Sequence, residues 1–140
     1  LLRVGVKPGP LYKKLKEGEK VFWKGKELRP EEFIKEEPGL KVVYVADTRP
    51  CDSIIENAFN ADILIHEATF AHDALDMARE AMHSTAREAG KNARKARVKQ
   101  LILMHYSSRY KNENLDKLRQ DAQREFDNVL LAKDFDKIQL

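Results

Sequence analysis

The stretch Lys41–Thr69, KVVYVADTRPCDSIIENAFNADILIHEAT, decides the fold. It contains two short apolar runs, residues 42–46 and 63–65, that are typical of buried strands. Between them the spacing predicts a helix that Pro50 can start, with one apolar face made by Ile54, Ile55, Ala58 and Phe59. A strand, a helix and a strand in so short a stretch form a βαβ unit, whose strands lie parallel.

Polar side chains follow each of these strands. Asp47 and Thr48 come directly after the first strand, and His66 and Glu67 come directly after the second. Ligands of open α/β sheets bind outside the carboxyl ends of the strands. The sequence therefore predicts a functional site at this edge, with Asp47, His66 and Glu67 side by side.

The segments after Thr69 continue the α/β pattern. Residues 71–82 indicate a loop with a short helix, and Thr85 with Glu88 forms a capping box that starts a longer helix. That helix has a small-residue face for packing on a sheet: Ala86, Ala89, Ala93 and Ala96. The run 100–104, QLILM, predicts a third buried strand, which leads into polar residues 105–110.

The last part of the chain predicts one more helix and two short strands. Asn114 is a candidate cap for a helix with an apolar stripe at Leu115, Leu118, Ala122 and Phe126. Residues 129–131 and 138–140 are apolar runs of strand length. The chain as a whole is therefore of the α/β class.

Residues 1–37 differ from the rest in composition. Glycine and proline divide them into short extended pieces and turns, and residues 31–37 predict a short helix or linker. From Arg3 to Lys26 the sequence has eight basic residues against two acidic ones. One interpretation is a solvated β-hairpin whose lysines protect its edge, and the other is a platform for backbone phosphates.

Bulk composition limits the class of protein. The single cysteine of the 140-residue chain, Cys51, excludes an internal disulfide and favours a reducing compartment, so we expect a cytoplasmic protein. No apolar run is long enough to cross a bilayer, and no membrane partner is expected. A net charge of +3 does not by itself indicate nucleic acid.

Three of the four histidines stand where an apolar element stops: His66, His83 and His105. One histidine at such a place would more often be structural, but three at one sheet edge, with Asp47 and Glu67, favour a site. Aspartate and histidine are ligands of catalytic zinc, and a histidine can also move a proton near neutral pH. Arg109 suits a phosphate oxygen, as do hydroxyls at Ser84, Thr85, Ser107 and Ser108. The residues alone predict a metal or phosphate site.

Four motifs in order resemble the carboxyl-terminal motifs of ribonuclease Z, the tRNA 3′-processing endonuclease of the metallo-β-lactamase superfamily. They are Asp47-Thr48, residues 66–69 (HEAT), residues 83–85 (HST) and residues 105–110 (HYSSRY). Residues 5–21, GVKPGPLYKKLKEGEKV, resemble that family's flexible arm, which grips the tRNA body. Because the order and the identity of the motifs agree over almost the whole chain, the resemblance is specific.

The resemblance implies a fold and a function. Residues 38–140 would be the α/β carboxyl-terminal half of an αββα metallo-β-lactamase sandwich, and residues 1–37 part of the tRNA-binding arm with its return linker. The whole enzyme would be a cytoplasmic homodimer with two zinc ions. It would remove the 3′ trailer from precursor tRNA and leave a 3′-hydroxyl on the tRNA.

The resemblance also implies roles for single residues. Asp47 would bridge the two zinc ions and His105 would bind one of them. His83 would donate a proton to the leaving 3′-oxygen, with Glu67 orienting it. The scissile phosphate would contact Arg109, Ser107 and Thr85. The arm would meet tRNA phosphates through Lys7, Lys13, Lys14 and Lys16.

The sequence departs from the family at two places. Ala46 stands where the family usually has glycine. The His-x-His-x-Asp-His motif that supplies most metal ligands is absent. An aspartate and a histidine cannot fill a tetrahedral zinc site, so we expect this chain to hold zinc weakly and to be inactive alone. The alternatives are another phosphodiesterase or sulfatase-like hydrolase of the superfamily, and a non-catalytic RNA-binding or scaffold chain.

Overall fold

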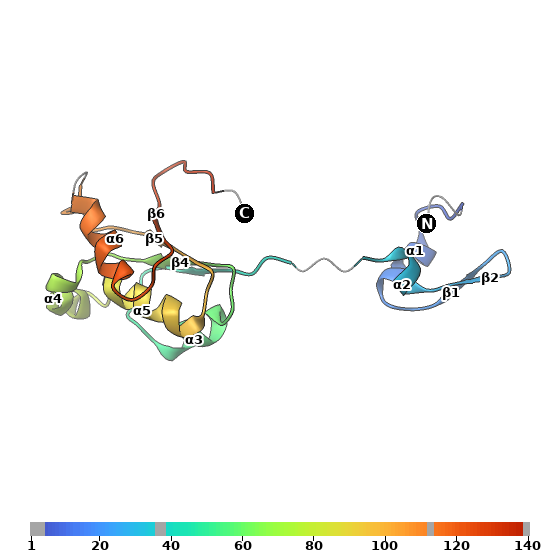
Figure 1. Ribbon diagram of the computed structural model, residues 1–140, viewed down its shortest axis with the longest axis horizontal. Coiled ribbons are helices and arrows are strands. Elements are labelled where there is room, and N and C mark those ends of the chain that lie inside the picture. Colours follow the sequence, from blue (N-terminus) through green and yellow to red (C-terminus); the bar gives the residue numbers. More distant parts are fainter. Residues whose placement is uncertain (1–4, 36–38, 112–113, 139–140) are drawn as a thin grey trace. The chain divides into compact units, whose positions relative to one another are not determined.

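The structure is a computed structural model, and it describes residues 5–35, 39–111 and 114–138. The chain divides into two compact units, Leu1–Gly39 and Leu40–Leu140, which are described separately (Figure 1). The division falls two residues beyond the boundary expected between residues 37 and 38. Within the described ranges no helix is long and apolar enough to cross a membrane.

The first unit is a β-hairpin between two short helices. Its elements are α1 (Pro10–Lys16), β1 (Val21–Trp23), β2 (Lys26–Leu28) and α2 (Pro30–Phe33). The strands pair antiparallel, and the turn residues Lys24 and Gly25 both have positive φ, at 50° and 77°. Two left-handed residues in a two-residue loop match the right-handed twist of a hairpin.

Helix α1 corrects the expectation of extended pieces and turns. Pro10 stands at the first helical position, where its missing N–H costs nothing, and Leu15 lies fully buried one turn later. Leu15 packs with Val6, Val21 and Leu28 in a small core of its own. Tertiary burial of this one leucine therefore fixes a helix in a segment rich in lysine.

The second unit is a parallel sheet with connecting helices. Its elements are β3 (Val42–Val45), α3 (Asp52–Ala58), β4 (Ile63–Glu67), η2 (His72–Ala74), α4 (Leu75–Glu80), α5 (Ala86–Ala96), β5 (Gln100–Met104), α6 (Leu115–Gln123) and β6 (Val129–Leu131). The strand order is β3-β4-β5-β6, and every neighbouring pair is parallel. The predicted βαβ unit and the third strand are confirmed.

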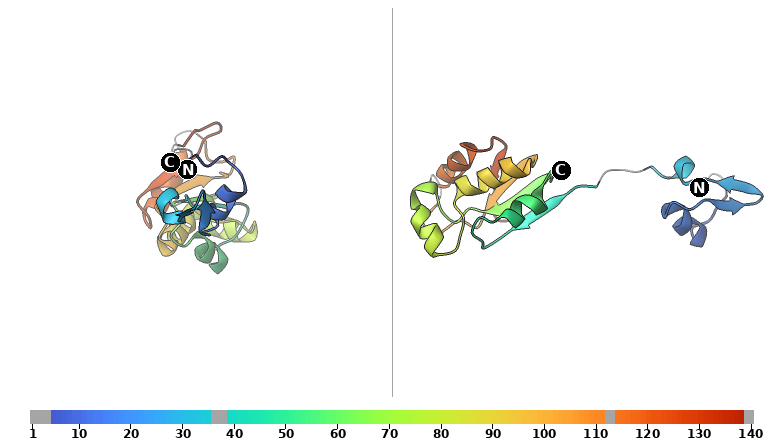
Figure 2. Two further views of the ribbon diagram at one scale, coloured as in Figure 1. Left: turned by 90° about the vertical axis from the view of Figure 1, so that its right-hand side faces the viewer. Right: turned by 90° about the horizontal axis from the view of Figure 1, so that it is seen from below.

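Helices α3, α5 and α6 share one face of the sheet. Leu64, Leu101 and Leu103 of β4 and β5 form a single core with the alanines of α5. Figure 2 shows α3 and α5 side by side in this layer. On the opposite face Val42 and Tyr44 of β3 are 47% and 66% exposed. Only one face of the sheet is thus covered by helices in the described residues.

Helix α5 is held closely at its start and its middle. The predicted capping box is present, because Thr85 accepts from the Glu88 amide and Glu88 accepts from the Thr85 amide. Gly90 has no room for a side chain, since a Cβ there would lie 2.5 Å from the carbonyl oxygen of Ala122 in α6. The small-residue face of α5 therefore lets α6 approach backbone to backbone.

Several local expectations need correction. Phe59 follows α3 and is 46% exposed instead of lying on its buried face. Helix α3 begins at Asp52, two residues after Pro50. Asn114 precedes α6 but its side chain makes no capping hydrogen bond. Ile138 lies outside any strand, and residues 139–140 lie outside the described residues. The segment 71–82 does contain short helices, as expected.

Candidate metal centre

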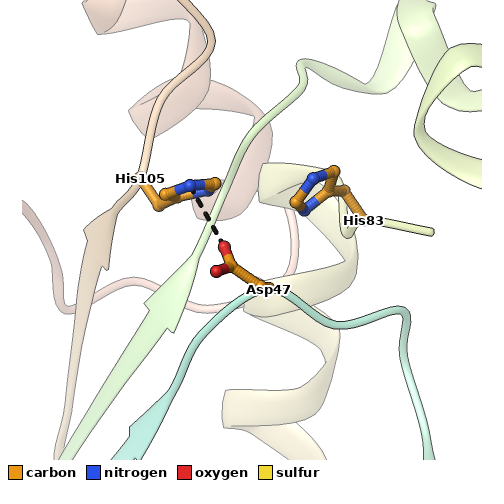
Figure 3. Close-up of side chains that lie close together, drawn as sticks. All are labelled: Asp47, His83 and His105. Carbon is orange, nitrogen blue, oxygen red and sulfur yellow. Dashed lines mark ion pairs between the residues drawn. The ribbon is translucent and has the colours of Figure 1, made fainter. Parts of the chain in front are cut away.

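Three side chains meet at the carboxyl edge of the sheet. Asp47 follows β3, His105 follows β5, and His83 stands shortly before α5 (Figure 3). One possible ligand atom from each lies within 4.8 Å of the others, and His105 Nε2 is 3.1 Å from Asp47 Oδ1. The Asp47 and His105 side chains are 64% and 47% exposed. The cluster is therefore open to a metal ion and to a substrate.

Asp47 and His105 both adopt left-handed backbone conformations. Their φ angles are 47° and 55°, which non-glycine residues rarely adopt. His105 directly follows the last residue of β5, and Asp47 follows β3 after the single residue Ala46. Strained backbone that persists at a site is a sign of a functional constraint. Here the two turns leave the carboxylate and the imidazole facing each other.

Glu67 is the buried anion beneath the cluster. Its side chain has no exposed surface, and its two oxygens accept four hydrogen bonds. Oε1 accepts from the Thr48 amide at 2.7 Å and from His83 Nδ1 at 2.9 Å. Oε2 accepts from the Thr69 hydroxyl at 2.6 Å and from the Thr69 amide at 3.3 Å. Burial would raise the pKa of Glu67, but hydrogen bonds from Thr69, His83 and Thr48 together lower it.

His83 is oriented by this carboxylate. Because an ionised carboxylate only accepts, His83 Nδ1 carries the proton and Nε2 is the nitrogen left for chemistry. The His83 ring lies 5.4 Å from the His105 ring and 6.3 Å from the Phe70 ring, measured between centroids. The expected pairing of His83 with Glu67 is thus present in the structure.

His66 corrects the predicted constellation. It is the fourth residue of β4, is fully buried, and accepts from Asn92 of α5 at 3.1 Å. Its Nδ1 lies 2.7 Å from the carbonyl oxygen of Glu67. Burial lowers the pKa of His66, which favours the neutral ring that this pairing requires. Neighbouring strand residues point to opposite faces, so Glu67 reaches the site and His66 does not.

Thr69 is a member of the site for which the sequence predicts no role. Its hydroxyl lies between Glu67 Oε2 and His105 Nδ1, at 2.6 Å and 2.9 Å. It is buried, with 7% of its surface exposed. The available signal was its spacing of two residues from Glu67, which places both side chains on the same side of extended chain.

Two exposed arginines flank the cluster. Arg109, the predicted phosphate ligand, lies with its guanidinium carbon 5.4 Å from the Phe70 ring centroid and with Nη1 3.2 Å from the Met77 sulfur. Arg49, which was not assigned, has Nη1 3.7 Å from the sulfur of Met82, next to His83. No ion pair to a carboxylate involves either guanidinium within the described part of the chain. Both remain available for an anionic ligand.

The hydroxyl residues near the cluster have different roles. The Ser84 hydroxyl is buried and donates to the Thr48 carbonyl at 2.6 Å. The Thr85 hydroxyl is buried and pairs with Glu88 at the start of α5, which argues against its predicted phosphate contact. Ser107 is half-buried, and its amide donates to the Thr69 carbonyl at 3.1 Å. The hydroxyls of Ser107 and of exposed Ser108 can therefore still serve a phosphate.

The four assigned lysines lie in the first unit. Lys13, Lys14 and Lys16 are exposed on α1, and Lys7 is exposed in the loop before it. Lys13 is 3.8 Å from Glu17 and Lys14 is 3.9 Å from Glu19. Exposed pairs of this length are weak. These weak ion pairs therefore leave the ammonium groups available to a negatively charged partner.

The comparisons with known proteins agree with this geometry. Residues 32–106, more than half of the chain, match the model of a beta-lactamase superfamily domain. The chain belongs to the beta-lactamase superfamily. Within that superfamily it is 47% identical to the ribonuclease Z of Archaeoglobus fulgidus, over 94% of this chain and 43% of that protein. The resemblance to ribonuclease Z is thereby confirmed.

Solved structures of the superfamily show the same fold. The metallo-β-lactamase fold protein YhfI of Bacillus subtilis matches 66% of this chain and 37% of its own, with a TM-score of 0.59 at 36% identity. Human tRNase Z, short form, matches 81% of this chain and 36% of its own, with a TM-score of 0.57 at 30% identity. The chain spans less than half the length of the curated relatives it matches, 43% to 46%.

The donor set in this beta-lactamase superfamily chain fits a transition metal. One carboxylate and two imidazoles are the ligand types that zinc accepts, and three protein ligands suffice for one catalytic zinc. Asp47 has two carboxylate oxygens and can therefore bridge. The geometry is compatible with His83 either as a third ligand or as a proton donor, and the two roles differ in what happens to metal content when His83 is removed.

Proposed function

We propose that this chain is the carboxyl-terminal half of a zinc-dependent endoribonuclease that removes the 3′ trailer from precursor tRNA. The observation that carries the proposal is the cluster of Asp47, His83 and His105 at the carboxyl edge of a parallel sheet. It occurs in a chain whose relatives bear the name ribonuclease Z. The family resemblance extends the proposal to a cytoplasmic homodimer.

The metal site would be completed by residues outside this chain. Asp47 and His105 would hold the zinc from this chain, and most ligand positions would be left to the rest of the enzyme. When bound, zinc lowers the pKa of water and stabilises negative charge on phosphate oxygens. The 140-residue chain alone should therefore bind zinc weakly and cleave no precursor tRNA.

His83 would act as the general acid. Its Nε2 faces the open cluster, and its Nδ1–H donates to Glu67 Oε1, with 2.9 Å between the nitrogen and the oxygen. A proton on Nε2 would be passed to the leaving 3′-oxygen of the tRNA, whose alkoxide is a poor leaving group without an acid. The buried carboxylate of Glu67 holds the ring in position for this transfer.

Phosphate recognition would use the two arginines that lack acidic partners within the described residues. Arg109 and Arg49 offer planar guanidinium groups, which suit phosphate oxygens because two N–H groups can donate together. Contacts with Phe70, Met77 and Met82 restrict where these groups lie without neutralising them. The Ser107 hydroxyl would add a neutral donor to the scissile phosphate.

The lysines of the first unit would bind the tRNA body. The four lysines expected to contact tRNA are exposed: Lys7, Lys13, Lys14 and Lys16. Their flexible side chains can follow the phosphates of a duplex backbone and do not need a phosphate at one fixed position. Such contacts carry no sequence information. They would therefore increase affinity for tRNA as a class and contribute nothing to the chemical step.

A chimera tests the proposal directly. In this chimera the chain replaces the matching part of Archaeoglobus fulgidus ribonuclease Z, which is 47% identical over that part. We expect the chimera to trim the 3′ trailer of a precursor tRNA in zinc, and the 140-residue chain alone to show no trimming. Size-exclusion chromatography of the chimera tests the homodimer.

Controls decide what a failure means. Circular dichroism and zinc analysis establish that the chimera is folded and loaded. A folded, loaded chimera that leaves precursor tRNA intact would refute the proposal. Hydrolysis of a small phosphodiester alone would favour a different hydrolase of the superfamily, and trimming by the isolated chain would refute the incomplete site.

A further inference from the structure

The hydrogen bonds around Thr69 have a fixed direction. Glu67 is buried, and its two oxygens face the backbone amides of Thr48 and Thr69, which can only donate; this arrangement suits an ionised carboxylate, which only accepts. The Thr69 hydroxyl has one proton and lies 2.6 Å from Glu67 Oε2, a short contact between oxygens that requires a proton between them. That proton therefore belongs to the bond with Glu67.

The direction of the next bond follows from this. Thr69 Oγ1 also lies 2.9 Å from His105 Nδ1. Since the only hydroxyl proton is already donated to Glu67, the hydroxyl can only accept from His105. Nδ1 must then carry a proton, and the neutral imidazole has its lone pair on Nε2, where a bound metal ion would separate it from the Asp47 oxygen that lies 3.1 Å away. Nε2 is the nitrogen that faces Asp47 and the open cluster.

We infer that Thr69 is a positioning residue that keeps the proton of His105 on Nδ1 and so presents Nε2 to the metal. The inference rests on the proposed role of His105 as a metal ligand. A ligating histidine needs a hydrogen-bond acceptor for the N–H of its other ring nitrogen, which fixes both the tautomer and the ring orientation. Thr69 provides that acceptor from a buried position.

The consequence is that one anion orders both histidines of the site. Glu67 holds the Nδ1 proton of His83 directly and that of His105 through the Thr69 hydroxyl. Both Nε2 atoms are thereby left for the cluster. A serine at position 69 keeps this link, whereas a valine of similar shape removes it and leaves Glu67 Oε2 with only the backbone amide of residue 69.

Nitrogen NMR of the isolated 140-residue chain tests the inference without metal or substrate. In an alkaline buffer where imidazoles are neutral, Thr69 and the Asp47 carboxylate compete for the single proton of His105, and we expect the wild type and Thr69→Ser to show it mainly on Nδ1. In Thr69→Val the proton should move to Nε2. His83 is the internal control, because its contact with Glu67 is direct and its proton should stay on Nδ1 in all three proteins.

Zinc titration of the same proteins gives a second readout. The His105 ring signals report the zinc concentration at half-saturation. This concentration should rise about 10- to 100-fold in Thr69→Val and stay near the wild-type value in Thr69→Ser. A wild-type His105 with its proton on Nε2 would overturn the inference. So would a Thr69→Val chain that keeps the wild-type tautomer and zinc midpoint. Neither result depends on whether precursor tRNA is the substrate.

Discussion

The cluster around Glu67 and the lysines of helix α1 hold their charges in opposite ways. Glu67 has no exposed surface and accepts four hydrogen bonds, which fix its position. Lys13 and Lys14 are 78% and 58% exposed, and their nearest carboxylates are 3.8 Å and 3.9 Å away. The carboxylate of Glu67 is thus held at one position, whereas the ammonium groups of α1 are free to move.

This difference separates two kinds of function. A displacement of about 1 Å is costly for catalytic groups, because proton transfer and metal binding need defined distances. Binding to a phosphate backbone tolerates such displacement, since the energy comes largely from released counterions. Substitutions in the second unit should therefore act on the chemical step, and substitutions in the first unit on affinity and its salt dependence.

The largest effect is expected at the ligands. In the chimera, Asp47→Ala and His105→Ala should each lower the cleavage rate by several orders of magnitude, because each removes a group that holds metal. Single-turnover rates and zinc content measure this. Asp73→Ala, which removes an exposed carboxylate paired with Lys117, is the matched control and should cleave normally. Near-normal rates for either ligand variant would contradict the assigned roles.

His83 should produce the next largest effect. If it is the general acid, His83→Ala should lower the rate of the chimera about 10²- to 10⁴-fold and leave its zinc content intact. A substrate with a sulfur leaving group needs no proton and should restore the rate. Loss of zinc in this variant would instead make His83 a third ligand, which the distances within the cluster also permit.

Glu67 should control stability as well as chemistry. In Glu67→Gln one carboxylate oxygen becomes an NH2 group, which then faces the donors either of Thr48 and His83 or of Thr69, so the isolated chain should lose about 1–3 kcal/mol of unfolding free energy at neutral pH. Urea denaturation measures this. Asp73→Asn, at an exposed ion pair, should have little effect.

The pH dependence of the same two proteins is a separate test. The pKa of Glu67 in the folded chain lies below its ordinary value of 4.5, so the folded state binds fewer protons than the unfolded state there. Its contribution is present above that value and is lost as pH falls through the folded-state pKa. Glu67→Gln should therefore lose less stability than wild type on acidification below about pH 4.5. Parallel acid profiles would show that Glu67 contributes little.

The smallest effect on chemistry is expected in the first unit. Changing Lys7, Lys13, Lys14 and Lys16 of the chimera to glutamate should raise KM with little change in kcat. The dependence of tRNA affinity on salt should become shallower, by about one unit of log–log slope for each phosphate that the lysines no longer neutralise. A small phosphodiester that cannot reach these lysines should be hydrolysed as before.

A matched set of lysines in the second unit controls for total charge. Lys95, Lys111, Lys133 and Lys137 are also exposed, and their change to glutamate alters the net charge equally. Equal reductions of tRNA affinity in both sets would mean that net charge, not the position of α1, binds tRNA. Unchanged affinity in the α1 set would support the solvated hairpin.

The sheet was predictable because its signals are local. Three of its strands end in or lead into polar residues, and the capping box at Thr85 is read directly from residue spacing. The contrast with α1 is instructive. Its helical state depends on Leu15 packing against Val21 and Leu28, which are brought near by the chain reversal that follows. Sequence pattern reports such a contact poorly in a short, basic segment.

The site was predictable as a set of residues but not as a network. Motif order placed Asp47, His83 and His105 together, and the structure brings them within 4.8 Å. The assignment of His66 was wrong because strand β4 continues through it and turns its ring toward α5. The hydrogen bond between Thr69 and His105 depends on the register in which β4 and β5 pair. No single stretch of the sequence determines that register.

The left-handed backbone at Asp47 and His105 allows related sequences to show whether the site is still under selection. A left-handed conformation costs a residue with a side chain about 1 kcal/mol, a cost that glycine avoids and asparagine reduces. Selection for stability alone would therefore replace both residues. In a lineage that keeps this fold as a scaffold after losing cleavage, glycine or asparagine should appear at these two positions before the buried core changes. Retention of aspartate and histidine there would mark lineages in which the chemistry is still under selection.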